Sequence, residues 1–288
     1  MRHVVLGIAL SLAVVPALAQ DRGRPAVRLP VLELGVGGGG GLAPDYPAAE
    51  QSHWRGVLTP YLIYRGDVLR ADEQGARLRG LRNGSTELAL SAAGAFPASS
   101  RDNRAREGMP DLDWLGEVGP TLQVTLHRDT GSPQPRRLLL DLPLRLAFSA
   151  DAHAVRFRGV TFEPELAYER NGLLFRDSRL RLALGVVLGS QEYMDYFYGV
   201  PAEFARAGRA PYTAEAGYLG TRLSLSVRVP ITESFSVVAG GRVSNFSGAT
   251  NADSPLFRSE WGYAVAAGFR WILYRSERTV EGSIDPFL

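Results

Sequence analysis

The sequence predicts an all-β protein, a transmembrane, antiparallel, up-and-down β-barrel of about twelve strands, with about ten as the alternative. Three observations predict it: an export signal at the start, long runs with an apolar residue at every second position, and connections that alternate between long loops and tight turns. The chain has 288 residues, a formal net charge of +2 and 22% charged residues. Such a chain can enter a bilayer only if each strand keeps its polar residues on one face.

The first 19 residues have the form of a cleaved signal peptide. Arg2 and His3 precede an apolar run at residues 4–15, and Ala17-Leu18-Ala19 fits the small-x-small pattern before a cleavage site. The run is shorter than the roughly 20 residues that a membrane-spanning helix needs. We therefore expect residues 1–19 to be removed and residues 20–30 to form an N-terminal segment in the periplasm. The absence of cysteine suits this compartment and excludes a lipid-modified N-terminal cysteine.

The middle of the chain shows the strand period most clearly. In residues 137–149 one set of alternate positions is apolar throughout: Leu138, Leu140, Leu142, Leu144, Leu146 and Phe148. The other set contains Arg137, Asp141 and Arg145. A period of two places the two sets on opposite faces of a strand, whereas a helix would scatter the leucines around its circumference. The same pattern in residues 117–127, 179–188 and 218–229 covers the roughly 9–11 residues of a membrane-spanning strand.

Weaker alternation predicts the remaining strands, at residues 31–41, 54–65, 68–72, 76–81, 86–96, 155–169, 235–246 and 261–274. The short pair at 68–72 and 76–81 is the least regular, and without it the barrel would have about ten strands. The barrel is thus expected to occupy residues 31–274, followed by a C-terminal tail at residues 275–288.

The connections fall into two alternating sets. Long polar loops are expected at residues 42–53, 97–113, 150–154, 190–217 and 247–260, and tight turns at residues 66–67, 82–85, 129–135, 170–172 and 230–234. Outer-membrane barrels have long extracellular loops and short periplasmic turns, so both termini are expected in the periplasm.

A soluble β-sandwich or lipocalin-like barrel is the alternative, because alternation alone does not say which face is inside. In that case the leucines would fill a core and the opposite charges would face water. Aromatic residues favour the membrane, because they gather at both ends of the predicted strands, as interfacial girdles do. Trp54, Phe148 and Trp261 lie at the loop ends, and Tyr168 and Trp271 at the turn ends.

The strand face opposite the leucines is expected to line the barrel lumen, where charged residues at membrane depth pair with one another. The candidate lumen residues are Arg137, Asp141, Arg145, Glu163, Glu165, Arg179, Arg181, Arg222, Arg228, Arg242 and Arg270. They would either line a narrow pore or cross-link it shut. The alternation also places His127 on this face.

We expect no catalytic, cofactor, metal or nucleic-acid site. The glycine run at residues 35–41 contains the G-x-G-x-x-G spacing, but it lacks the following helix, or the Lys and Ser/Thr, that a phosphate site needs. Ser149, Asp151 and His153 lie together, and Ser52 precedes His53, yet these are ordinary turn residues. The sequence contains neither a metal-ligand spacing nor a clustered basic face.

The loop sequences resemble a known family. Residues 43–47 (Ala-Pro-Asp-Tyr-Pro) and 64–67 (Tyr-Arg-Gly-Asp) resemble the opening motifs of the MltA-interacting protein (MipA/OmpV) family of outer-membrane barrels. Residues 100–113 with 117–120 resemble its most distinctive stretch, and residues 196–200, 208–212 and 253–256 continue the similarity in order. The charged and polar members of the long segment are a candidate partner surface or a solvated loop: Arg101, Asp102, Asn103, Arg104, Arg106, Glu107, Asp111 and Asp113.

The resemblance implies a non-catalytic barrel in the Gram-negative outer membrane, a scaffold that brings a murein hydrolase and a murein synthase together. The alternative is a narrow porin-like channel for small solutes or antibiotics. The implied surroundings are outer-membrane lipid, lipopolysaccharide and the barrel-assembly machinery. Family members end on an aromatic residue that closes the last strand, whereas here residues 275–288 follow that strand, either as a second terminal signal at Phe287-Leu288 or as a free tail. Contacts with murein enzymes are expected at the turns, residues 21–28 or the tail.

Overall fold

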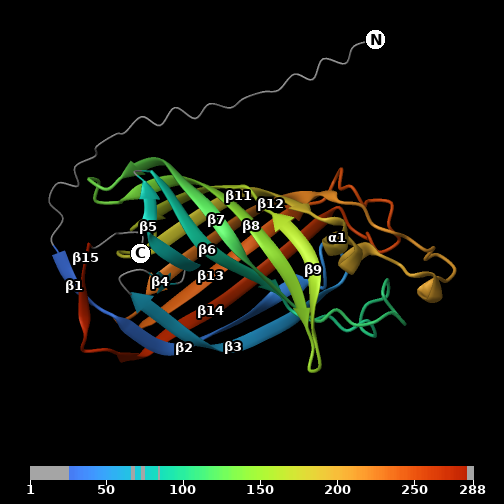
Figure 1. Ribbon diagram of the computed structural model, residues 1–288, viewed down its shortest axis with the longest axis horizontal. Coiled ribbons are helices and arrows are strands. Elements are labelled where there is room, and N and C mark those ends of the chain that lie inside the picture. Colours follow the sequence, from blue (N-terminus) through green and yellow to red (C-terminus); the bar gives the residue numbers. More distant parts are fainter. Residues whose placement is uncertain (1–25, 66–68, 73–74, 84, 284–288) are drawn as a thin grey trace, which may run out of the picture.

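The computed structural model describes residues 26–65, 69–72, 75–83 and 85–283, and the predicted signal peptide lies outside these residues. The described chain is almost entirely antiparallel β-structure wound into a barrel (Figure 1). The barrel strands are β2 (Leu32–Pro44), β3 (Ser52–Arg65), β4 (Leu69–Asp72), β5 (Gly75–Asn83), β6 (Thr86–Ala95), β7 (Trp114–Asp129), β8 (Arg136–Ala150), β9 (Val155–Phe162), β10 (Glu165–Asn171), β11 (Arg179–Gly189), β12 (Gly217–Pro230), β13 (Phe235–Asn245) and β14 (Trp261–Arg275).

The sheet closes on itself because the first and last strands of the barrel pair along their length. β14 pairs with β2 from Arg275 and Glu33 to Val265 and Leu42. On the opposite side, β8 pairs with both β9 and β10, and these two strands in turn pair with β11. β9 and β10 therefore share one position in the barrel.

The interruption between β9 and β10 lies at Glu163-Pro164, where the predicted strand was continuous. Proline has no amide hydrogen for the sheet ladder and so breaks it locally. The Pro164 carbonyl still accepts a hydrogen bond from the Val186 amide at 3.0 Å. Counting β9 and β10 together, the described sheet has the twelve predicted positions. The two shortest, β4 and β5, come from the pair that alternates least regularly.

The two faces of the wall differ as predicted. On β8, Leu144 and Leu146 face outward and are about half exposed, as lipid-facing side chains must be in the isolated chain. Leu139, Asp141 and Arg137 face inward and are buried. The membrane-barrel fold class is thereby confirmed, since an exposed leucine face is the reverse of what a soluble sheet presents.

The prediction that His127 faces the lumen is wrong. A β-bulge shifts the β7–β8 register between Thr125 and His127, so that His127 pairs with Leu138 and Arg128 pairs with Arg137. A bulge inserts one unpaired residue and reverses the faces of those that follow it. His127 therefore shares the outward face with Leu138, and Arg128 takes the lumen position.

The glycine run forms β2 and packs closely against β14. A Cβ atom built on Gly35 would lie 2.0 Å from the Trp271 carbonyl oxygen, and one on Gly41 would lie 2.1 Å from the Val265 carbonyl oxygen. Such distances exclude any side chain, so glycine here permits close strand approach in a curved wall. The next described element is strand β3, where a dinucleotide-binding motif would require a helix.

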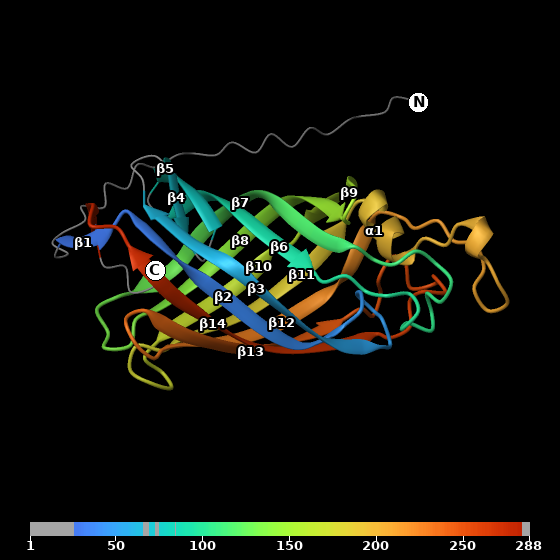
Figure 2. The ribbon, with the colours of Figure 1, turned by 90° about the horizontal axis from the view of Figure 1, so that it is seen from below.

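The two ends of the barrel carry different structures. Long loops, α1 (Gln191–Tyr198) and the short 3₁₀ helix η1 (Ala202–Phe204) gather at one end, which we call the loop end (Figures 1 and 2). At the other, the turn end, β1 (Ala26–Pro30) and β15 (Thr279–Ser283) form a separate two-stranded antiparallel ribbon. The described part of the tail is thus paired with the N-terminal segment. Among the described residues, no helix is long and apolar enough to cross a membrane.

Candidate functional site

The loops at the loop end fold into a compact cap with its own apolar core. The core brings together three of the predicted loops and α1, and it includes Tyr46, Ala48, Met109, Leu112, Tyr193, Met194, Phe197, Tyr198 and Leu256. It also includes residues at the lumen-facing ends of four strands: Leu115, Ala147, Val187 and Leu219. Because loop and lumen residues share one core, the cap fills the mouth of the barrel at this end.

Helix α1 anchors the cap in the mouth. Its residues Tyr193, Met194, Phe197 and Tyr198 lie on one face, at the i, i+1, i+4 and i+5 spacing of an amphipathic helix, and all four are buried. The rings of Tyr193 and Phe197 meet edge to face at 5.3 Å. Burial raises the pKa of the Tyr193 phenol well above its ordinary value. The phenol donates a hydrogen bond to Glu117 Oε1 at 2.9 Å, which ties the helix to β7 inside the barrel.

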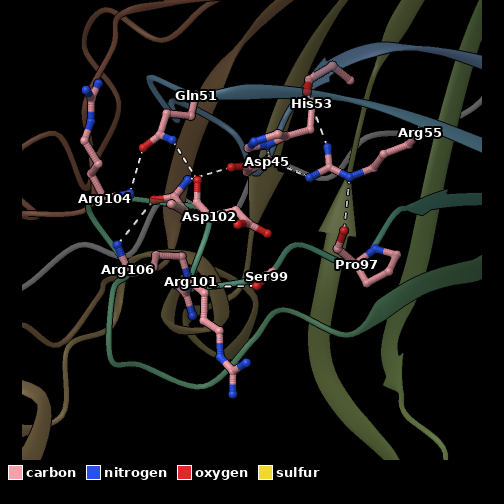
Figure 3. A network of polar contacts seen from close by, with 12 residues as sticks. Asp45, Gln51, His53, Arg55, Pro97, Ser99, Arg101, Asp102, Arg104 and Arg106 are labelled. Atoms are coloured by element: carbon pink, nitrogen blue, oxygen red, sulfur yellow. Dashed lines mark hydrogen bonds and ion pairs between the residues drawn. The ribbon is translucent and has the colours of Figure 1, made fainter.

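Asp45 is the polar centre of the cap (Figure 3). Its side chain is 1% exposed, and it accepts hydrogen bonds from His53 Nδ1 at 2.7 Å, from Asn103 Nδ2 at 2.7 Å and from Arg55 Nη2. Burial alone would raise the pKa of the carboxyl, but the hydrogen bonds from Asn103, His53 and Arg55 outweigh it and hold the pKa below its usual range. The carboxylate therefore joins the first long loop, at residues 42–53, to β3 and to the second long loop, at residues 97–113.

Arg106 fills a second buried polar position in the cap. Its Nη1 donates to the Phe197 carbonyl at 3.2 Å, its Nη2 donates to the Pro110 carbonyl at 3.3 Å, and its guanidinium lies 5.8 Å from the centre of the Tyr46 ring. These contacts link the second loop to α1. Desolvation by burial lowers the pKa of Arg106 from its ordinary value.

The segment that resembles the family's distinctive stretch is divided between the interior and the surface of the cap. Asn103 and Arg106 are buried, and Asp113, which is partly buried, accepts a hydrogen bond from Ser149 at 3.3 Å. Asp111 is exposed, although it accepts a hydrogen bond from the Ser100 amide at 2.6 Å. The remaining members are exposed: Arg101, Asp102, Arg104, which pairs with Glu50, and Glu107, which pairs with Arg206. The sequence pattern did not separate these two groups, because burial depends on contacts with distant loops.

One wall of the lumen carries an ion-pair network over β8, β10 and β11. Arg181 pairs with Asp141 at 2.9 Å, with Glu165 at 2.6 Å and with Glu169 at 2.7 Å. Arg137 pairs with Glu169 at 2.7 Å. Charges at membrane depth are stable only when paired in this way or hydrated.

A second cluster lies nearer the cap. Glu163, at the break between β9 and β10, accepts hydrogen bonds from Arg145 on β8 and Arg222 on β12, each at 3.0 Å. Arg145 Nε also donates to Ser91 Oγ on β6 at 3.0 Å. Arg242 on β13 lies across from Ser224 and Ala264, so it faces the same space.

A cavity of about 600 Å³ lies within the lumen beside these clusters. Arg179 and Arg228, which are direct neighbours across β11 and β12, contribute to its wall. Arg270 lies on β14 opposite Gly37, outside the residues that line the cavity. The opposite wall carries small side chains, because the inward positions of β14 and β2 include Ala264, Ala266 and several glycines.

The sequence patterns placed Glu117 on the lumen face but did not identify two other contributors, Glu169 and Tyr193. Glu169 lies four residues after Glu165 on the same face of the strand, so the period of two could have placed it in the lumen. Glu117 lies at one of the alternate positions of β7 that face the lumen. Tyr193 lies in a segment that was expected to be a loop, and only the helical spacing of its apolar neighbours points to it.

The candidate hydrolase groups do not assemble into a catalytic arrangement in the described chain. Ser149 Oγ contacts Asp113 and accepts a hydrogen bond from Arg158 Nε at 2.8 Å, while His153 contacts Asp151 through its backbone amide at 2.7 Å. His53 is bound to Asp45. Among the described residues, no group of three or more metal-ligating side chains is close enough to hold an ion.

Comparison with known proteins places the chain by its sequence. Residues 36–273 match the family model described as MltA-interacting protein MipA. Among solved structures, the chain is similar to a bacterial polysaccharide outer membrane secretin, with 12% identity, a TM-score of 0.36, and 85% of this chain and 99% of that chain covered. It is also similar to a Pseudomonas aeruginosa FadL homologue, with 8% identity, a TM-score of 0.26, and 84% and 90% covered. No curated protein matches the chain.

Proposed function

Since the chain belongs to the MltA-interacting protein MipA family, we propose that this outer-membrane β-barrel is a non-catalytic scaffold that holds murein-remodelling enzymes at the outer membrane. The folded cap is the observation that carries the proposal. Its core joins the loops to the lumen-facing ends of β7, β8, β11 and β12, so the barrel is plugged at one end. A plugged barrel suits an anchor better than a pore.

The orientation of the barrel decides which surface meets the enzymes. Long loops face outward and short turns face the periplasm in outer-membrane barrels. The turn end, which carries the ribbon of β1 and β15, therefore faces murein. The ribbon is a separate two-stranded sheet, so each of its strands has an edge that another strand can pair with. We infer that it is the docking element for a murein hydrolase such as MltA, after which the family is named, and for a murein synthase.

Removal of the ribbon tests this role. A variant that lacks residues 20–30 and 276–288 keeps β2 and β14 intact, so we expect it to fold but to lose capture of a purified murein hydrolase and synthase. Arg101→Ala combined with Arg104→Ala changes two exposed residues at the opposite end and serves as the matched control. Undiminished capture by the ribbon-less barrel, or loss of capture in the control, would contradict the assignment.

Export and assembly belong to the same proposal. A signal peptide at residues 1–19 would direct the chain to the periplasm, and the barrel-assembly machinery would insert it among outer-membrane lipid and lipopolysaccharide. N-terminal sequencing of the protein from outer membranes should then give Gln20 as the first residue. A mature chain that begins at Met1 would exclude cleavage.

A narrow channel is the second candidate function, and the lumen cavity of about 600 Å³ favours it. Its charged lining consists of four arginines, Arg145, Arg179, Arg181 and Arg228, and four carboxylates, Asp141, Glu163, Glu165 and Glu169, so it would suit small polar solutes without a strong preference for one sign of charge. Conduction would require the cap to move, because the cap core occupies the mouth at the loop end.

A further inference from the structure

The barrel wall has a discontinuity between β3 and β6. On one edge β3 pairs with β2 from Ser52 to Tyr64, but on its other edge the described pairs with β4 involve only Tyr64 and Arg65. β6 pairs with β7 along its full length, yet its described pairs with β5 end at Leu90. Among the described residues, Ser52–Pro60 of β3 and Ala92–Ala95 of β6 thus have no strand on the edges that face one another.

Exposure along the two strands agrees with an open edge. In the continuous wall, exposed and buried residues alternate on β7 at its start, and exposed runs on β14, which is paired on both sides, reach three residues, as at Val265–Ala267. Residues 56–60 of β3 and residues 92–95 of β6 are instead exposed at every position, which means that both faces of each strand are accessible. Leu58, on the outward face, is 70% exposed, against 48% for Leu144 in the continuous part of the wall.

The opening is bounded on all four sides. β3 and β6 form its sides, and toward the turn end lie the described pairs of β4 with β3 and of β5 with β6 (Figure 1). At the loop end Arg55 on β3 donates from Nε to the carbonyl of Pro97, just after β6, at 3.1 Å (Figure 3). The same guanidinium binds Asp45, so the cap holds this boundary in place. We call the opening the lateral window.

Unpaired backbone groups constrain what lies in the window. Each amide or carbonyl left without a partner in hydrocarbon costs several kcal/mol, and irregular backbone at membrane depth is tolerated where it lines a water-filled cavity. The lumen cavity reaches this edge, because Ala89, Ser91 and Ala92 of β6 contribute to its wall. The window therefore connects the cavity, which is lined with charged side chains, with the lipid-facing surface.

The groups beside the window within the lumen can hold an anionic head group. Arg145 lies one strand beyond β7 from the window edge, and its Nε donates to Ser91 Oγ, which also accepts a hydrogen bond from Thr121. In the second cluster three arginines, Arg145, Arg222 and Arg242, lie near two carboxylates, Glu163 and Glu117, which leaves an excess of one positive charge. The excess is local, because the cavity wall as a whole has four arginines and four carboxylates. Outside the window the surface is apolar, with Leu58 and Leu90 exposed.

From this arrangement we propose that the barrel binds a single-chain amphiphile with an anionic head group, the head held at Arg145 and Ser91 in the lumen and the chain passing through the lateral window to the lipid. A cavity of about 600 Å³ is large enough for such a molecule. The carboxylate of a fatty acid and the phosphate of a single-chain lipid satisfy the same donors. This activity is separate from enzyme scaffolding and does not depend on it.

Equilibrium binding to the full mature chain in nanodiscs of a neutral lipid tests the proposal. The probes are fluorescent analogues with one chain and three different heads: a carboxylate, a phosphate monoester and a trimethylammonium. We expect saturable binding of at least one anionic probe and at least about tenfold weaker binding of the cationic probe. Binding of only one anionic probe identifies the source of the ligand. Equal affinity for all three probes, or no saturable binding of an anionic probe, would overturn the proposal.

Variants separate the head site from the window. Arg145→Gln should weaken anionic binding by about tenfold and leave the cationic probe unchanged. Ala92→Phe fills the window and should weaken all binding. Ala267→Phe is the matched control, because Ala267 is also an outward alanine but pairs with strands on both sides. Folding of each variant is checked by the mobility of the unheated barrel in a denaturing gel. Equal loss in the Ala267→Phe variant would overturn the role of the window.

Thiol labelling tests the window itself without a ligand. The natural chain has no cysteine, so a single introduced thiol gives an unambiguous signal. Ala93→Cys, at the open edge of β6, should react with a maleimide that is dissolved in the bilayer. Ala266→Cys, on the inward face of the paired strand β14, should not react with it. Equal labelling at the two positions would show that the wall is closed between β3 and β6.

Discussion

Asp45 concentrates the polar contacts of the cap in one carboxylate. Replacement by Asn removes the charge from His53, Arg55 and Asn103 while keeping the size of the side chain. Breaking a buried pair of this kind costs about 3 kcal/mol or more, because the remaining charge is left without compensation. We therefore expect Asp45→Asn to loosen the cap, measured as faster proteolysis of the loops while the barrel keeps its folded gel mobility.

Glu107→Gln is the matched control for Asp45. Its pair with Arg206 joins two cap loops at 3.1 Å, but the side chains are 66% and 43% exposed. A surface pair contributes less than about 1 kcal/mol, so cap proteolysis should scarcely change. A loss as large as that in the Asp45 variant would show that burial of the carboxylate is not what stabilises the cap.

Tyr46 makes the cap sensitive to alkali. Burial raises the pKa of its phenol to about 12, and the phenol donates to the Leu256 carbonyl at 2.8 Å. A pKa raised above the ordinary value of about 10 gives stability that is complete below that pH and is lost as the pH rises through the folded value. We expect cap proteolysis to accelerate between about pH 10 and pH 12, and Tyr46→Phe to flatten this part of the profile. An unchanged profile would contradict the assignment to Tyr46.

For single residues, the sequence predicted which face of a strand a side chain lies on, but not which distant residues it contacts. The lumen positions of Asp141 and Arg145 follow from a period of two, because the alternation of faces is a local property of a strand. The meeting of Asp45 with Asn103 joins residues 58 positions apart and depends on how two loops fold over the mouth. The alternation gave the wrong face for His127, because a β-bulge beside it shifts the register and the residue types give no clear signal of that bulge.

Strand β2 shows at the scale of an element why a glycine run has unequal positions. Gly37 and Gly41 lie on the same face of the strand. A Cβ atom on Gly37 would lie 3.7 Å from the Phe269 carbonyl oxygen, which is an ordinary contact, whereas a Cβ atom on Gly41 would lie only 2.1 Å from the Val265 carbonyl oxygen. We expect Gly37→Ala to fold normally and Gly41→Ala to reduce the folded fraction, because the β2–β14 ladder must separate. The fraction of chain with folded gel mobility after refolding into detergent measures this. Equal yields of the two variants would contradict close packing at Gly41.

Elements differed in how far they could be predicted. The strands with regular leucine alternation, such as β8 and β11, were predicted within a few residues of their bounds, because burial and exposure alternate along the whole element. Helix α1 was expected to be loop, since its eight residues lie within a polar connection. The spacing of Tyr193, Met194, Phe197 and Tyr198 is the signal that could have identified it. The pairing of β1 with β15 joins the two ends of the chain, and no local pattern reports it.

At the scale of the whole molecule, the lumen is closed at one place, by the cap, and open at another, through the lateral window. The cap closes the loop end with a core shared between loops and strands, whereas the window leaves the wall open between β3 and β6. Regular alternation predicted the closed wall, and the two strands that alternate least regularly, β4 and β5, lie beside the discontinuity. With four residues, β4 is too short to span the membrane, so the wall is incomplete beside it.

The state of the mouth distinguishes an anchor from a channel, and α1 is the element to change. Tyr193→Ala with Phe197→Ala removes two buried rings from the cap core, at about 3–5 kcal/mol each, and breaks the hydrogen bond to Glu117. In planar bilayers we expect the natural protein to give no steady current and the double variant to conduct, because the lumen behind the cap contains a cavity of about 600 Å³ that is lined with charged side chains. Leu173→Ala with Leu174→Ala, in an exposed turn at the opposite end, is the control and should stay closed. A natural protein that conducts as well as the double variant would show that the cap does not seal the mouth, and the channel function would then replace the scaffold.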